Sequence, residues 1–384
     1  MTTLLEPIRP ELTHVARRPH LEWLDGLRGL AAAAVVLHHL HFALDLPFLV
    51  PRGYLAVDLF FLLSGYVLTY AYAGRLGAMS GSDFARLRLV RLLPMIVLGT
   101  LGGALLALVR FRGHEPAAAD LLVATILGSL ALPMLFHTSL LYEAFPINGP
   151  VWSLFFELLA SAVLFLAARR GALRPWSAAL TLAGALALVP IALLHRDISV
   201  GYLPPNWAGG FARVGFSFFA GVLLRIARPA LPAVPVAVAL ALCLGPFLVP
   251  QSLNLHGLVD LVAVFALFPI GVASLAQAQP AGRWIDACRL SGEASYPLYA
   301  IHYPIVLAVA SSWRVQALAT GARAGVAAAV TGGVVLLSLA ASRLFDVPVR
   351  RRLGALGRRQ PSRGIRRAPV PAPERARTGG RRRR

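Results

Sequence analysis

The sequence has few charged residues and no lysine. Charged residues make up only 14% of its 384 positions, and all 37 Lys-plus-Arg positions are arginine. A soluble domain averages about 25% charged residues, so this low share argues against a soluble enzyme. Apolar residues reach 57% and recur in runs of about 20 residues, the length that spans a bilayer. The sequence therefore predicts a polytopic, all-α membrane bundle.

Cysteine is also scarce. Cys243 and Cys288 are the two cysteines, and their spacing matches no metal site. We therefore expect neither a disulfide nor a bound metal. Residues 1–20 contain three prolines, two acids and an arginine pair rather than an apolar core, so we do not expect them to be a cleaved signal.

The placement of arginines predicts the membrane topology. Cytoplasmic loops are enriched in basic residues, and Arg17 and Arg18 therefore place the N-terminus inside. Ten crossings also bring the arginine-rich loops and the C-terminus inside, whereas eleven crossings would leave them outside. The segment 119–137 is then a re-entrant or interfacial helix. The ten expected spans are 24–44, 54–74, 90–110, 150–168, 177–194, 209–227, 231–249, 257–277, 292–312 and 323–345.

We expect three parts along the chain. Residues 1–22 form a cytoplasmic segment, 23–348 a membrane domain, and 349–384 a disordered cytoplasmic tail. Residues 350–384 hold fourteen arginines and one glutamate, so they supply +13 of the formal net charge of +20. Such a tail either contacts anionic lipid or only fixes the topology, and we expect no nucleic-acid partner.

The first span, "LDGLRGLAAAAVVLHHLHF", contains ionisable residues inside an apolar run. Arg28 and His39 are eleven residues apart, which places them on one helical face roughly 16 Å apart along the axis. His38 points elsewhere. Arg28 is either an anchor that reaches the interface or a functional cation. His39 is either a packed, hydrogen-bonded histidine or a catalytic base.

Two carboxylates are expected inside the bundle. Asp58 lies near the outer end of the second span, where it either caps the helix or orients an imidazole on the first span. Glu157 follows Ser153 by four residues in "INGPVWSLFFELLA", which puts both on one helical face. An acid at membrane depth must be paired or line a cavity.

Basic, aromatic and hydroxyl residues form three further groups. Arg88 and Arg91 in "FARLRLVRLLP" either bind phosphate or form a basic loop that stops translocation. Trp152 is either an interface anchor or a surface on which a sugar ring stacks. In "SGEASYPLYAIHYPIV", Tyr299 and His302 continue a polar stripe that is either a binding surface or a hydrogen-bond ladder.

These motifs together resemble the acyltransferase-3 family of integral membrane O-acyltransferases. They occur in the order "LDGLRGLAAAAVVLHH", "GYLAVDLFFLLSG", "RLVRLLP", "NGPVWSLFFE" and "SYPLYAIHYP", and the likeness covers about residues 22–346. The resemblance implies that His39 is the catalytic base and that Arg88 and Arg91 bind the phosphates of cytoplasmic acyl-CoA. For such an enzyme we expect Asp58 or Glu157 to orient His39, and we expect Arg28, between the donor phosphates and the base, to neutralise the pantetheine-phosphate end of the donor.

The expected activity is transfer of an acyl group, acetyl by family precedent, from acyl-CoA to a hydroxyl group. The acceptor is a surface polysaccharide, a lipid-linked glycan or a glycosylated small molecule, in contact with Trp152, Ser153, Tyr299 and His302. The resemblance places the chain in a bacterial inner membrane. The alternative function is a proton-coupled transporter or flippase, in which His39, Asp58 and Glu157 form a proton relay.

Overall fold

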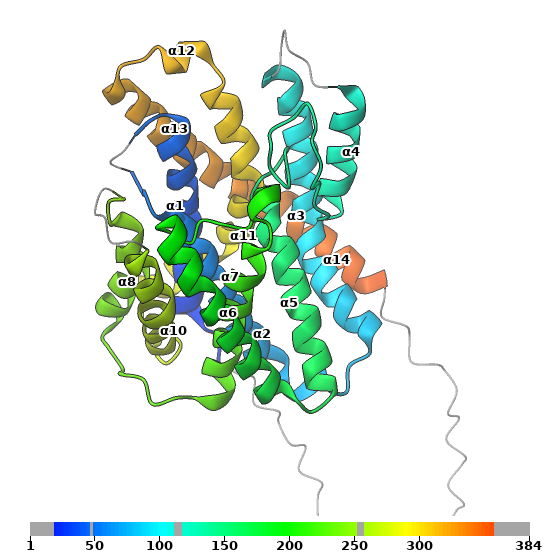
Figure 1. Cartoon of the computed structure of the whole chain (residues 1–384), viewed down its shortest axis with the longest axis vertical. Helices are drawn as coiled ribbons and strands as arrows, with labels where there is room; N and C mark the ends of the chain where they lie inside the picture. The colour runs from blue at the N-terminus through cyan, green and yellow to red at the C-terminus, as the bar shows by residue number, and fades with distance from the viewer. Residues whose placement is uncertain (1–18, 47–48, 111–116, 252–256, 357–384) are drawn as a thin grey trace, which may run out of the picture.

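The structure, a computed structural model, describes residues 19–46, 49–110, 117–251 and 257–356. Within these ranges every regular element is a helix (Figure 1). The prediction of an all-α fold is confirmed. Arg17 and Arg18, on which the expected topology partly rests, lie outside the described residues.

Twelve helices of eight or more residues make up the bundle in the described ranges, with short helical segments between them. They are α1 (Glu22–Ala43), α2 (Ala56–Leu76), α3 (Gly81–Arg110), α4 (Ala118–Ser129), α5 (Val151–Arg169), α6 (Leu173–His195), α7 (Gly209–Ala227), α8 (Val236–Leu244), α10 (Phe268–Leu275), α11 (Arg283–Ala310), α13 (Thr320–Ala341) and α14 (Val347–Leu356). The short elements are η1 (Gly53–Leu55), η2 (Pro204–Asn206), η3 (Gly245–Leu248), α9 (Leu258–Val262), η4 (Ala263–Leu267), α12 (Trp313–Gln316) and η5 (Ser342–Asp346).

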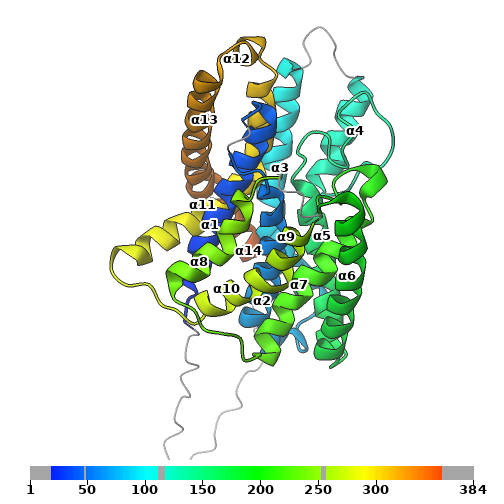
Figure 2. The ribbon, with the colours of Figure 1, turned by 60° about the vertical axis from the view of Figure 1, so that its left-hand side comes forward.

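Seven helical stretches in the described ranges are long and apolar enough to cross a membrane. They do not include α1 or α11, whose polar and charged side chains lower their hydropathy. The predicted number of ten crossings therefore stays a prediction. The expected segment 119–137 is helical only as far as Ser129, and α4 packs beside α3 (Figure 2).

The centre of the bundle is built on two closely packed helix pairs, α1 with α11 and α2 with α7 (Figure 1). Gly65 of α2 and Gly221 of α7 let the second pair approach. A Cβ added at Gly65 would lie 1.9 Å from the Phe218 carbonyl oxygen, and one at Gly221 would lie 2.1 Å from that of Leu62. Small residues at such crossings let helices pack closely in a membrane.

Helix α11 continues through Pro297 and Pro304. Because proline has no N–H, Pro304 leaves the Ala300 carbonyl without its helical partner. The Asn148 side chain donates to that oxygen over 2.8 Å. This bond ties the 143–150 segment, and hence the start of α5, to the middle of α11.

The last helix extends further than expected. Helix α13 continues through η5 into α14, so residues 349–356 are helical rather than part of a disordered tail. Residues 357–384 lie outside the described residues.

Candidate active site

A cavity with polar lining and a volume of about 660 Å³ lies where five long helices meet. Helix α1 contributes His39 to its wall, and the segments before α5 and α7 close it from the other side. Its other polar and aromatic lining residues are His38, Phe42, Tyr54, Glu143, Trp152, Asp197, Ser199, Tyr202, Arg213, Gln251, Tyr299 and Tyr303. We call this the outer cavity.

His39 is held by a second histidine. Its Nδ1 lies 3.0 Å from Nε2 of His302, which is fully buried on α11. The Tyr303 ring packs edge-on against His39, with ring centroids 4.9 Å apart. The close α1–α11 pair therefore brings together two residues that lie at opposite ends of the sequence.

The hydrogen bonds of His302 fix the proton positions of both rings in their neutral forms. Nδ1 of His302 lies 2.9 Å and 3.0 Å from the carbonyl oxygens of Leu298 and Tyr299. Carbonyl oxygens only accept, so this Nδ1 holds the proton and Nε2 has a lone pair. Nδ1 of His39 must then donate to it, which leaves the lone pair of His39 on Nε2.

His38, the neighbouring residue, has a different environment. Its Nδ1 donates to the Val50 carbonyl over 3.0 Å, and its ring packs edge-on against both Phe42 and Tyr54. It is 8% exposed, and its bonded partner is backbone of the following loop rather than an ionisable side chain.

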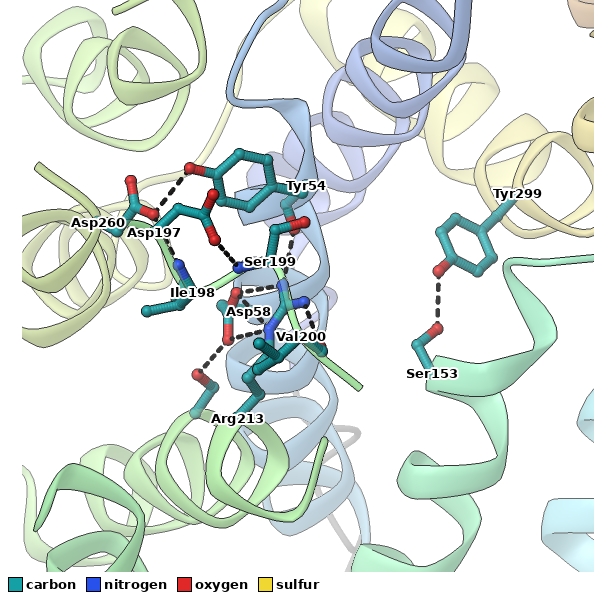
Figure 3. Close-up of polar contacts among 11 residues, drawn as sticks. Tyr54, Asp58, Ser153, Asp197, Ile198, Ser199, Val200, Arg213, Asp260 and Tyr299 are labelled. Atoms are coloured by element: carbon teal, nitrogen blue, oxygen red, sulfur yellow. Dashed lines mark hydrogen bonds and ion pairs between the residues drawn. The ribbon is translucent and has the colours of Figure 1, made fainter. Parts of the chain in front are cut away.

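Asp58 is paired with a residue that the sequence analysis did not single out. Arg213 of α7 donates from Nη2 to Asp58 over 2.6 Å, and Ser217 donates to the same carboxylate over 3.2 Å (Figure 3). Both ionised side chains are almost completely buried. This corrects the expectation that Asp58 orients His39, because the buried guanidinium needs the carboxylate.

The same network holds the loop that closes the outer cavity. Arg213 also donates to the carbonyls of Tyr54 and Val200, over 2.8 Å and 3.1 Å. A second buried acid, Asp260, accepts from the Tyr54 hydroxyl over 2.7 Å and from the Ile198 amide over 3.1 Å (Figure 3). The 197–200 segment is therefore fixed from both sides.

A neutral phenol lies on that loop. Burial raises the pKa of Tyr202, and the carboxylates of Glu143 and Asp197 add to this effect. Tyr202 lines the outer cavity, and its hydroxyl stays protonated and can donate a hydrogen bond.

The expected acceptor residues lie around the inner end of the outer cavity. The Ser153 and Tyr299 hydroxyls face each other over 2.7 Å (Figure 3). Trp152 lines the cavity with the Arg213 guanidinium 5.1 Å from its ring centroid. His302, by contrast, does not line the cavity and reaches it only through His39.

Two more cavities follow toward the opposite end of the bundle. A constriction of about 40 Å³ shares Val57 and Tyr299 with the outer cavity. It shares Arg28 and Glu157 with a third space of about 360 Å³, which we call the inner cavity. A succession of cavities thus runs from His39 to the start of α3.

The inner cavity contains the predicted arginines. Arg28, Arg88 and Arg91 all line it. Arg88 donates to Glu157, which also accepts from Ser64 over 2.9 Å. Glu157 is therefore a partner of Arg88 and makes no described hydrogen bond to His39, which corrects its expected role in orienting the base.

Arg91 is held by an aromatic ring. Its guanidinium lies 5.2 Å from the ring centroid of Tyr296, whose hydroxyl donates to the Leu92 carbonyl. Stacking of this kind fixes a cation while leaving its N–H groups free to bind a ligand.

Most of the chain matches the sequence profile of one known protein family. Residues 21–343 match the sequence profile of the acyltransferase-3 family, described as an acyltransferase domain. The chain belongs to the acyltransferase-3 family. It is a membrane O-acyltransferase that uses an acyl donor.

Two curated proteins share parts of this acyltransferase-3 sequence. Protein 2 in the picA locus of Rhizobium radiobacter is 36% identical over 154 residues, which cover 36% of this chain and 78% of the relative. The peptidoglycan O-acetyltransferase OatA of Listeria monocytogenes is 42% identical over 52 residues, 14% of this chain and 8% of its own length. No solved structure matches the chain.

Arg213 and Asp260 were not among the predicted site residues, although each is an ionisable residue inside an apolar run of this acyltransferase-3 sequence. An arginine in "GGFARVGFSFF" and an aspartate in "GLVDLVAVFALF" both interrupt apolar runs. Ionisable residues inside spans are costly and are paired. No spacing rule, however, could have matched each of them to its partner on another helix.

Proposed function

We propose that this protein transfers an acetyl group from cytoplasmic acetyl-CoA to a hydroxyl group of a carbohydrate. The acceptor is a surface polysaccharide, a lipid-linked glycan or a glycosylated small molecule. The protein works in a bacterial inner membrane with both termini in the cytoplasm. The succession of cavities supports this proposal, since donor and acceptor can enter from opposite ends.

The hydrogen bond between His39 and His302 is the observation on which the proposed mechanism rests. It leaves Nε2 of His39 with a lone pair on the ring that lines the outer cavity. A positioned base of this kind contributes about 10²–10⁴-fold to the rate of proton transfer from a hydroxyl. His302, which is held by two backbone carbonyls, stabilises the imidazolium that forms.

In the proposed reaction, Nε2 of His39 removes the proton as the acceptor oxygen attacks the thioester carbonyl. A carbon–oxygen bond forms and the carbon–sulfur bond breaks. The leaving thiolate of CoA then takes the proton back from His39. The products are an O-acetyl ester and free CoA, and no oxidant or further reactant is needed.

The lining of the outer cavity supports a carbohydrate acceptor. Trp152 and Tyr303 offer ring faces on which a sugar can stack, while Asp197 and Gln251 offer hydrogen-bonding groups. The O-acetyltransferase name of one matched relative points to the same chemistry.

The inner cavity supports a phosphate-bearing donor. Arginine binds phosphate through paired N–H groups, and Arg28, Arg88 and Arg91 line one space. The arginine-rich residues 357–384, which lie outside the described residues, would add contact with anionic lipid on the same side.

Acetyl transfer in isolated membranes tests this function. Membranes that contain the full chain, incubated with acetyl-labelled acetyl-CoA, are expected to accumulate label in carbohydrate as an alkali-labile ester. Membranes without the chain are the control. If the purified protein neither binds nor consumes acetyl-CoA, the proposal fails and the transporter alternative is favoured.

A further inference from the structure

The last helix brings an ion pair to the inner cavity that the sequence analysis did not consider. Between α13 and α14, residues Ser342–Asp346 form a π-helical turn. Such a turn holds an extra residue, which rotates the next helical segment by about 100° relative to a regular helix. Asp346, at the end of this turn, forms an ion pair with Arg350 on α14, whose Nη2 lies 2.8 Å from the carboxylate.

Arg350 lines the inner cavity together with Arg28, Arg88 and Arg91. Glu157 is the single acidic residue in that lining, so four arginines and one glutamate give it a net charge of +3. The charges of Arg28 and Arg350 both repel that of Arg91. Asp25 and Asp346, which do not line the cavity, lie 3.9 Å from Arg28 and 2.8 Å from Arg350 and offset part of this charge. The positive charge that remains in the lining favours the binding of an anion.

Two of these arginines have a buried N–H group without a hydrogen-bond acceptor among the described residues. In the described part of the chain, neither Arg88 nor Arg350 has an acceptor for its buried Nε. The Arg350 side chain is 27% exposed, whereas Asp346 is 1% exposed. The guanidinium therefore has N–H groups left for a ligand in the cavity while its Nη2 stays beside the buried carboxylate.

Helix α14 is itself fixed against the helix that contains the other arginines. Arg86 of α3 donates to the Leu353 carbonyl of α14, and the two helices pack together. This contact holds Arg350 beside the arginines of α3 although more than 250 residues separate them in the sequence.

We propose that Arg350 is a further phosphate ligand for the donor, and that its remaining N–H groups bind a phosphate oxygen while Asp346 keeps its counter-ion. This inference rests on the proposed function. Helix α14 then completes the donor site. Arg350 makes this site prefer donors that contain phosphate to donors that do not.

The test compares Arg350→Gln with the matched variant Arg351→Gln. Both variants remove one positive charge from α14, but Arg351 is exposed and does not line the cavity. The full-length protein is placed in nanodiscs of uncharged lipid, and CoA binding is measured by calorimetry. Arg350→Gln is expected to weaken CoA binding about 10- to 100-fold, as the loss of a charge-assisted bond implies, and Arg351→Gln to leave it unchanged.

A donor without phosphate distinguishes a loss of phosphate binding in Arg350→Gln from a loss of folded protein. Arg350→Gln is expected to use S-acetylpantetheine as well as the unchanged protein does. Equal CoA affinity in the two proteins, or an equal loss with S-acetylpantetheine, would overturn the role of Arg350. If the unchanged protein bound no CoA, the proposed function itself would fail.

Discussion

Replacing His39 with alanine is expected to lower acetyl transfer by about 10²–10⁴-fold, because the acceptor hydroxyl loses its base. CoA affinity should stay unchanged, since His39 does not line the inner cavity. The measurement is the initial rate of acetyl transfer at saturating acetyl-CoA, with protein amount checked by immunoblot. His38→Ala is the matched control, since it removes an adjacent imidazole from the same helix.

The two histidine variants distinguish between adjacent candidates for the base. His38→Ala is expected to retain the chemical step. A full loss in His38→Ala together with an active His39→Ala would contradict the assignment. His302 adds a second criterion: His302→Leu should lower kcat, and His302→Gln, whose carbonyl oxygen can still accept from His39, should restore part of the loss.

Replacing Asp58 with leucine is expected to destabilise the fold rather than to remove a catalytic group. The Arg213 guanidinium is 1% exposed and would be left without its counter-ion, which costs about 3–5 kcal/mol of unfolding free energy. The measurement is the melting temperature of the purified protein in detergent. The double variant Asp58→Leu with Arg213→Met should recover part of the loss, because no charge is then left unpaired, although the Tyr54 and Val200 carbonyls lose their donor.

The double variant also tests the role expected from the sequence. If Asp58→Leu kept the melting temperature of the unchanged protein and lost only activity, Asp58 would act on catalysis after all. If the double variant stayed as unstable as the single one, the ion pair would not be the cause of the loss.

Much of the helical architecture could be predicted because hydrophobic length and the placement of charge are local properties of the sequence. The first span was expected at 24–44 and the structure gives Glu22–Ala43. Arg28 and His39 were expected on one helix, one near each end, and they line the inner and outer cavities. The 3.6-residue period alone was enough for this inference.

The pairing of charged side chains could not be predicted, because it depends on which helices become neighbours. Asp58 faces α7 because Gly65 and Gly221 allow α2 and α7 to approach closely. Glu157 contacts Arg88 and His39 contacts His302. Both contacts join helices that are far apart in the sequence, so they too depend on which helices become neighbours. The sequence identified residues that need partners, and only the fold supplies those partners.

The extent of the last helix was also underestimated, because an arginine-rich sequence is typical of disorder as well as of a helix exposed to water. Residues 349–356 continue a helix that began at Thr320 through a π-helical turn. No pattern in "SRLFDVPVRRRL" signals that Arg350 turns inward while Arg351 stays exposed.

In the proposed mechanism, the donor phosphates lie in the inner cavity and the acyl group reaches the His39 imidazole in the outer cavity. This arrangement is tested most directly by cryo-electron microscopy of the full chain with a non-hydrolysable acetyl-CoA analogue. We expect density for the phosphates among Arg88, Arg91 and Arg350, and for the acyl carbonyl in the outer cavity within reach of His39 Nε2. An analogue bound with its acyl end away from that cavity, or with its phosphates outside the arginine cluster, would contradict the account.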